Sequence, residues 1–166
     1  MPGQLWAPWR LRYLEDETLR IKTTPSGCFL LDLPAQTQDR ENLILYRGQT
    51  AFVILNRYPY SNGHLMVAPY QHTANMADLT DQELLEIHQL VARCVAWLTE
   101  AFRPHGFNIG VNLGSAGGAG VPTHLHWHIV PRWEADTNFM TVVGETRVIP
   151  LSLEDTYDRL APLAQA

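Results

Sequence analysis

Three histidines alternate with apolar residues in the last third of the chain. His124, His126 and His128 are separated by one residue each, which is the period of a β-strand, where alternate side chains point to the same face. We therefore expect a strand over residues 124–130, with the three imidazoles on one face and the intervening apolar side chains in the core. A single histidine is usually an ordinary core or surface residue, but a row of three favours a functional site.

Two chemistries can use such a row. Histidines two residues apart can ligate zinc or iron, but a catalytic metal site needs a third ligand, often a carboxylate. The nearest downstream acid, Glu134, lies beyond Pro131. Alternatively, a neutral imidazole can attack phosphorus while neighbouring histidines and backbone amides hold the phosphate oxygens. This second chemistry requires an anion-binding loop nearby.

A glycine-rich loop over residues 112–121 directly precedes the histidines. Four glycines in this stretch allow backbone N–H groups to approach an anion closely. The loop is not a P-loop, because no Gly-Lys-Ser/Thr sequence follows. It is not a dinucleotide-binding fingerprint either, because a strand rather than a helix comes next. Its position before the three histidines favours a phosphate-binding nest.

The remaining elements predict how these residues are positioned. Thr80 and Glu83 form a capping box, and the apolar residues after them recur every three or four positions until Pro104, which predicts one long amphipathic helix. Cys94 lies on its apolar stripe and is expected to be a small core residue. A short helix is expected to start near Leu153. Strands are predicted over 42–46, 51–55, 64–68, 107–113 and 124–130.

These elements predict the α+β class, with a five-stranded antiparallel sheet covered by one long helix. We expect a single domain over residues 1–166, with a core at about 40–133 and extensions at both ends packing on it. One covering helix leaves a sheet face or edge exposed, so a homodimer or larger homo-oligomer is predicted.

Composition excludes several classes of function. The formal net charge is −5 and no run of Lys or Arg occurs, which disfavours nucleic-acid binding. No apolar stretch approaches the roughly 20 residues that span a membrane. Only two cysteines occur, and no secretory leader is recognisable, so a cytoplasmic protein is expected.

The segment from His124 to Val130 matches the His-φ-His-φ-His-φ-φ signature (φ, apolar) of the histidine triad (HIT) superfamily without a gap. The chain also resembles the diadenosine tetraphosphate phosphorylase-like branch of this superfamily. The segments that carry this wider resemblance are 5–10, 40–46, 55–64 and 136–147.

The resemblance implies a HIT-like fold and a nucleotidyl transferase or hydrolase that cleaves dinucleoside polyphosphates. In such an enzyme His126 attacks the α-phosphate and forms a nucleotidyl-histidine intermediate, which phosphate or water then releases. His124 and His128 orient His126 and hold phosphate oxygens. The resemblance also implies that Asn56 contacts the ribose and that Ile54 lies beside the base. The phosphates would be bound by Asn112 and by the backbone amides of Gly118, Ala119, Gly120 and Val121.

The resemblance also bears on cofactors. Many relatives bind structural zinc through a Cys-x-x-Cys pair and two histidines, here matched by Cys28, His72 and His124. Leu31 stands where the second cysteine would be, so no tightly bound metal is expected. Magnesium would arrive with the polyphosphate, bound mainly by substrate oxygens.

Two alternatives to the enzyme remain open. The first is a nucleotide-binding regulatory HIT protein with weak, phosphoramidase-type hydrolase activity, although the intact His126 favours the enzyme. The second is a mononuclear metalloenzyme, which is disfavoured because no carboxylate lies close and the glycine loop would have no use. For His64, which follows a turn glycine, a role in supporting the site residues or a place in the nucleotide pocket is slightly favoured over an ordinary strand position.

Overall fold

The computed structural model describes residues 25–134, 136 and 149–166. Segment 5–10 and nearly all of segment 136–147, which carry part of the resemblance, lie outside the described residues. Within the described part of the chain, no helix is long and apolar enough to cross a membrane.

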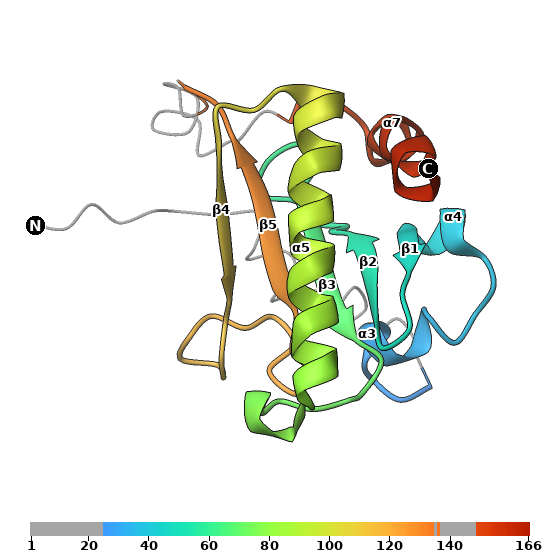
Figure 1. The fold of residues 1–166 in the computed structure, drawn as a ribbon, viewed down its shortest axis with the longest axis vertical. Helices are drawn as coiled ribbons and strands as arrows, with labels where there is room; N and C mark the ends of the chain where they lie inside the picture. Colours follow the sequence, from blue (N-terminus) through green and yellow to red (C-terminus); the bar gives the residue numbers. More distant parts are fainter. Residues whose placement is uncertain (1–24, 135, 137–148) are drawn as a thin grey trace, which may run out of the picture.

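A five-stranded antiparallel sheet forms the centre of the molecule (Figure 1). Its spatial order is β1-β2-β3-β5-β4, and every neighbouring pair is antiparallel. This confirms the predicted α+β class and sheet. The strands are β1 (Ile44–Arg47), β2 (Ala51–Leu55), β3 (Leu65–Pro69), β4 (Gly106–Val111) and β5 (Trp127–Arg132).

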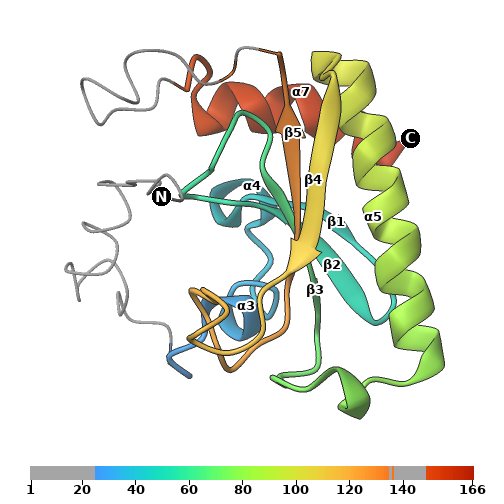
Figure 2. The same ribbon diagram turned by 90° about the vertical axis from the view of Figure 1, so that its left-hand side faces the viewer.

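The long helix α5 (Asp81–Phe102) covers one face of this sheet, while α3 (Phe29–Asp32) lies on the opposite side (Figure 2). The predicted capping box starts α5, because Thr80 Oγ1 accepts from the Glu83 N–H and the Glu83 carboxylate accepts from the Thr80 N–H. Cys94 is fully buried, and burial raises the pKa of its thiol far above the usual value, which confirms a core role. The buried residues of α5 are Ile87, Leu90, Val91, Cys94, Trp97 and Leu98.

Helix α7 (Leu153–Gln165) is longer than the short helix predicted near Leu153. Ser152 caps it by accepting from the Asp155 N–H. The Tyr157 hydroxyl donates to the Ile44 carbonyl at 3.0 Å, so α7 is fixed beside the edge strand β1. The other helical segments are α4 (Asp39–Asn42) and the 3₁₀ turn η1 (Met76–Asp78).

The first strand begins later than predicted. Residue 42, expected to open a strand, instead ends α4, and Leu43 adopts a left-handed conformation with φ of 62°. The Leu43 N–H closes the helix by donating to the Arg40 carbonyl. Strand β1 therefore starts at Ile44, whereas β2 matches its prediction and β3 and β4 differ by one or two residues.

The histidine strand also begins later than predicted, at Trp127 instead of residue 124. Pro69 ends the neighbouring strand β3, its carbonyl oxygen lies 2.9 Å from Nε2 of His124, and the Leu125 N–H donates to the Thr73 carbonyl, so the ladder between β3 and β5 stops before these residues. The alternation of faces persists nevertheless. Leu125 and Trp127 are buried in the core, and the Trp127 ring meets the ring of His88, a residue of α5.

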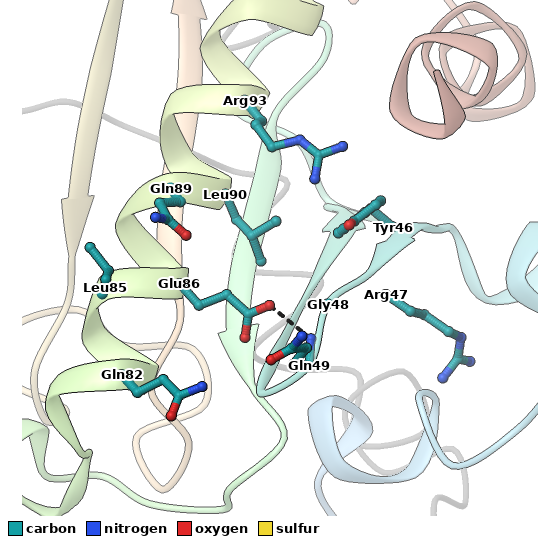
Figure 3. Close-up of a pocket in the computed structure, with 10 residues that line it drawn as sticks. All are labelled: Tyr46, Arg47, Gly48, Gln49, Gln82, Leu85, Glu86, Gln89, Leu90 and Arg93. Atoms are coloured by element: carbon teal, nitrogen blue, oxygen red, sulfur yellow. Dashed lines mark hydrogen bonds between the residues drawn. The ribbon is translucent and has the colours of Figure 1, made fainter.

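The carboxylate of Glu86 connects α5 to the turn between β1 and β2 by hydrogen bonds (Figure 3). It accepts from the N–H groups of Gln49, at 2.7 Å, and Thr50, at 2.6 Å, and from the Thr50 hydroxyl. A Cβ on Gly48 would lie 2.7 Å from the Ala51 carbonyl oxygen and would also touch this carboxylate, so glycine is required there. Burial raises the pKa of Glu86, but the hydrogen bonds outweigh it and the pKa falls below 4.5.

Glu86→Gln is expected to lower the free energy of unfolding at pH 7 by about 2 kcal/mol, because a charged acceptor of several hydrogen bonds is lost. A carboxyl group whose pKa is lowered by folding stabilises the protein above its unfolded pKa, and this contribution is lost as the pH falls through the folded pKa. The difference between variant and wild type should therefore shrink towards pH 3. Urea unfolding from pH 7 to pH 3 measures this, with Glu100→Gln on the exposed side of α5 as the control. A difference independent of pH would contradict it.

Candidate active site

Strand register aligns Ile54, Met66, His128 and Gly110 in one row across β2, β3, β5 and β4. Directly paired residues share a face of the sheet. Because Trp127 faces α5, this row lies on the opposite face. The structure thus brings Ile54, predicted beside the base, into the row that contains His128, although the two residues lie far apart in the sequence.

His126 lies on the same face and is buried. Its Nδ1 lies 2.8 Å from the carbonyl oxygen of His124. Since a carbonyl can only accept, Nδ1 of His126 carries the proton and donates. The lone pair of the ring is therefore on Nε2, which is the form of imidazole that can act as a nucleophile.

Burial also decides the charge of the buried histidines. Desolvation lowers the pKa of His126, partly offset by its hydrogen bond to the His124 carbonyl. Desolvation likewise lowers the pKa of His124, against a raising contribution from the Pro69 carbonyl. Both imidazoles are consequently neutral at pH 7. The neutral ring of His126 can therefore offer its lone pair to an incoming phosphate.

His128 lies beside His126, with ring centroids 4.9 Å apart in an edge-on arrangement. Its Nδ1 is 2.9 Å from Nε2 of His64, which is fully buried. The ring of Tyr60 stacks near both, at 4.6 Å from His64 and 5.9 Å from His128. The sequence pattern predicts no role for Tyr60, and only its closeness to His64 along the chain points to one.

Asn56 directly follows β2 and is half-buried. Its Oδ1 accepts from the Tyr58 N–H at 2.9 Å, and its Nδ2 lies 3.2 Å from Nδ1 of His64. It is thus connected to His128 through His64. The predicted contact of Asn56 with a ribose stays a prediction.

The glycine loop runs between β4 and the histidines. Asn112 follows Val111, which pairs with Trp127, so continuing the register places Asn112 across from His126. Gly118 has φ of +84°, a conformation that favours glycine, and its N–H donates to the Ser115 carbonyl. The Ala119 N–H similarly donates to the Gly114 carbonyl. Phosphate binding by these two amides would require the loop bonds to open, and the roles of Gly120 and Val121 stay predictions.

Cys28, His72 and His124 form a cluster whose ligand atoms all lie within 4.8 Å of one another. Cys28 Sγ lies 3.3 Å from His124 Nδ1, while His124 Nε2 lies 2.9 Å from the Pro69 carbonyl. Burial raises the pKa of the Cys28 thiol, so the S–H can donate to His124. A structural zinc site takes four protein ligands. Among the residues that the structure describes, the cluster offers three and falls one short of that set.

A cavity of about 490 Å³ lies elsewhere, between α5 and the β1–β2 turn (Figure 3). Arg93 lines it and lies over the Tyr46 ring at 4.2 Å. None of the histidine row lines this cavity. It is separated from His126 and His128 by the sheet, because they face away from α5.

Comparison with known proteins identifies the family. A model of the HIT domain matches residues 37–135. An AP-4-A phosphorylase of Mycobacterium tuberculosis is 40% identical over 162 residues, which is 95% of this chain and 82% of that protein. A bis(5'-nucleosyl)-tetraphosphatase (asymmetrical) of Schizosaccharomyces pombe is 32% identical over 120 residues, which is 72% of this chain and 62% of that protein.

Solved structures give the same result. A hypothetical histidine triad nucleotide-binding protein of Sulfolobus tokodaii superposes with a TM-score of 0.61 at 26% identity, covering 74% of this chain and 83% of that one. A zinc-bound histidine triad family protein of Mycobacterium smegmatis has a TM-score of 0.61 at 25% identity, and the match covers 74% of this chain and 84% of that one. With the sheet, the buried histidines and the matched sequence in agreement, this chain belongs to the HIT family.

Proposed function

We propose that this protein, a HIT-family nucleotide hydrolase or transferase, cleaves dinucleoside polyphosphates such as diadenosine tetraphosphate through a covalent intermediate on His126. The observation that carries the proposal is the hydrogen bond from His126 Nδ1 to the His124 carbonyl, which leaves the Nε2 lone pair for attack. The similarity to an AP-4-A phosphorylase over nearly the whole chain supports this substrate class.

In the first step, Nε2 of His126 attacks the α-phosphorus, the P–N bond forms and the bond to the bridging oxygen breaks. The electron pair of the broken bond leaves with the departing polyphosphate, which for diadenosine tetraphosphate is ATP. Neutral imidazole is a competent nucleophile near pH 7, and the P–N bond is readily cleaved in a second step. The buried, neutral state of His126 fits this role.

In the second step, an acceptor attacks the same phosphorus and His126 is released. If the acceptor is inorganic phosphate, the second product is ADP, whereas water gives AMP. The product pair from diadenosine tetraphosphate therefore identifies the reaction: ATP plus ADP for phosphorolysis, and ATP plus AMP for hydrolysis.

We further propose that folding does not require zinc. Leu31 stands three positions after Cys28, where the resemblance expects a second cysteine, and it packs against the core as a partly buried hydrophobic residue. The Cys28 thiol and the His124 ring satisfy one another by a hydrogen bond at 3.3 Å.

We also propose a homodimer that pairs through β4. This strand ends the sheet, and among the described residues no strand covers its outer edge. Ile109 in its middle is 48% exposed. The opposite edge, β1, is covered by α7 through Tyr157. An exposed edge with an apolar residue favours pairing with a second copy.

His126→Ala should lower kcat for diadenosine tetraphosphate by about 10³-fold or more, because a covalent nucleophile is removed. Product formation is followed with and without phosphate. Rapid quenching of the wild type with radiolabelled substrate should trap the intermediate as label on His126 that is stable in alkali and lost in acid. His88→Ala, which replaces an exposed histidine of α5 that lies outside the histidine row, is the control. A His126→Ala enzyme that keeps its kcat would exclude the mechanism, and binding without turnover by the wild type would favour the regulatory alternative.

Metal analysis of the purified wild type should find far less than one zinc per chain, and chelation should leave its melting temperature unchanged. Leu31→Cys adds the missing thiol and should raise both the zinc content and the melting temperature in the presence of zinc, with Leu31→Ala as the matched control. One tightly bound zinc per wild-type chain, with unfolding on chelation, would show this prediction wrong.

Light scattering at micromolar concentration should give the mass of a dimer. Ile109→Lys places a charge on the β4 edge and should shift the equilibrium towards monomer, whereas Leu85→Lys, at an exposed position of α5, should leave it unchanged. A wild type that stays monomeric, or equal behaviour of the two variants, would rule out pairing through β4.

A further inference from the structure

Gly110 lies inside β4, directly opposite His128 of β5 in the strand register. A glycine inside a strand weakens it, because glycine has no side chain to pack and loses more conformational freedom on folding than other residues. The backbone of Gly110 does not require glycine, since its φ lies outside the left-handed region. Backbone conformation therefore gives no reason for a glycine at this position.

Packing within the protein gives no reason either. A Cβ on Gly110 would meet no atom of the described residues within 4 Å, its chain neighbours aside, and the residue is exposed. Gly117 is different, because a Cβ there would lie 2.4 Å from the Leu113 carbonyl oxygen and would disrupt the loop. Gly110 thus leaves open a space that a side chain could occupy without touching the described part of the protein.

This open space lies on the face of the sheet that carries the histidines. Gly110 ends the row that crosses β2, β3, β5 and β4 on the side away from α5, and Ile54 begins it. Neighbouring strands are about 4.8 Å apart, so the row spans roughly 14 Å. Strand β4 is the edge of the sheet (Figure 1), and among the described residues no strand lies beyond Gly110.

A second glycine of this strand, Gly106, also has no described atom within 4 Å of an added Cβ. It is the first residue of β4 and pairs with Arg132, at the end of β5 away from the histidines. Its position between the end of α5 and the strand is typical of a turn glycine. Gly110 differs because it lies within the strand and beside a histidine of the row.

We propose that Gly110 is a specificity-determining residue, whose missing side chain lets the departing polyphosphate of the substrate lie over β4. This inference rests on the proposed function. In that reaction one nucleoside lies towards Ile54 and the α-phosphate lies within reach of His126, so the rest of the substrate extends towards β4. Asn112, the predicted phosphate ligand, follows two residues after Gly110 and shares its face of the chain. A glycine inside a strand often marks the close approach of a ligand.

Four substitutions test this role. Gly110→Ala and Gly110→Val add side chains of increasing size to the open space, and Gly106→Ala and Gly106→Val make the same changes about 13 Å away along the strand. All four variants should keep or raise the wild-type melting temperature, because the new Cβ meets no described atom and glycine weakens a strand. A loss of activity in the Gly110 variants is then not a loss of folding.

Gly110→Val should lower kcat/KM for diadenosine tetraphosphate by about 10- to 100-fold, because a displaced polyphosphate misaligns the α-phosphate with His126. Gly110→Ala should show a smaller loss, and the Gly106 variants should keep the wild-type value. Calorimetry in a His126→Ala background measures binding without turnover. There Gly110→Val should weaken the binding of diadenosine tetraphosphate and leave the Kd of AMP unchanged, since AMP has no polyphosphate.

A wild-type kcat/KM in Gly110→Val, or equal weakening of AMP and diadenosine tetraphosphate binding, would overturn the proposal. Light scattering that shows loss of a dimer only in the Gly110 variants would assign the open space to a second copy of the chain, and would overturn it too. If the wild type binds diadenosine tetraphosphate without cleaving it, the proposed function fails, while the binding comparison still decides the role of Gly110. If the wild type neither binds nor cleaves it, both fail.

Discussion

The burial of Leu125, Trp127 and Ile129 against α5 is the constraint on which the candidate site depends. Side chains alternate along the chain here, so holding these three in the core places His126 and His128 on the opposite face. Burying a large apolar side chain is worth about 1.5–3 kcal/mol. A shift of register by one residue would expose several of them at once, and no single hydrogen bond in the site, worth about 1 kcal/mol, could offset that loss.

Once the rings are in place, backbone groups determine their protonation. A carbonyl oxygen fixes the proton of His126 on Nδ1, and the N–H of Tyr60, which donates to Nδ1 of His64, places the proton of the neutral His64 ring on Nε2. Desolvation keeps His126 and His64 neutral. The backbone cannot change its donor or acceptor character with pH, so these assignments hold wherever the fold holds.

The elements with strong local signals were predictable from the sequence. The Thr80 capping box and the apolar period fixed helix α5, and the alternation fixed which face the histidines take. Features set by contacts distant in sequence were not predictable. Strand β5 starts only at Trp127, because residues 124 and 125 bond to Pro69 and Thr73 outside the strand ladder. The left-handed Leu43 reflects the end of a four-residue helix too short to show a period. The partnership of His64 with His128, 64 positions away, exists only through the pairing of β3 with β5.

The Cys28–His124 pair shows how the buried ring of His124 is held in place. His124 is buried, so each ring nitrogen needs a partner, and an unsatisfied one would cost about 1–3 kcal/mol. The Pro69 carbonyl accepts from Nε2, which leaves Nδ1 as an acceptor for the Cys28 thiol. The raised pKa of that thiol keeps it protonated and able to donate. The ring of His124 is thus held at both ends, and its own carbonyl holds His126. The hydrogen bond from Cys28 to His124 therefore also supports the contact between His124 and His126.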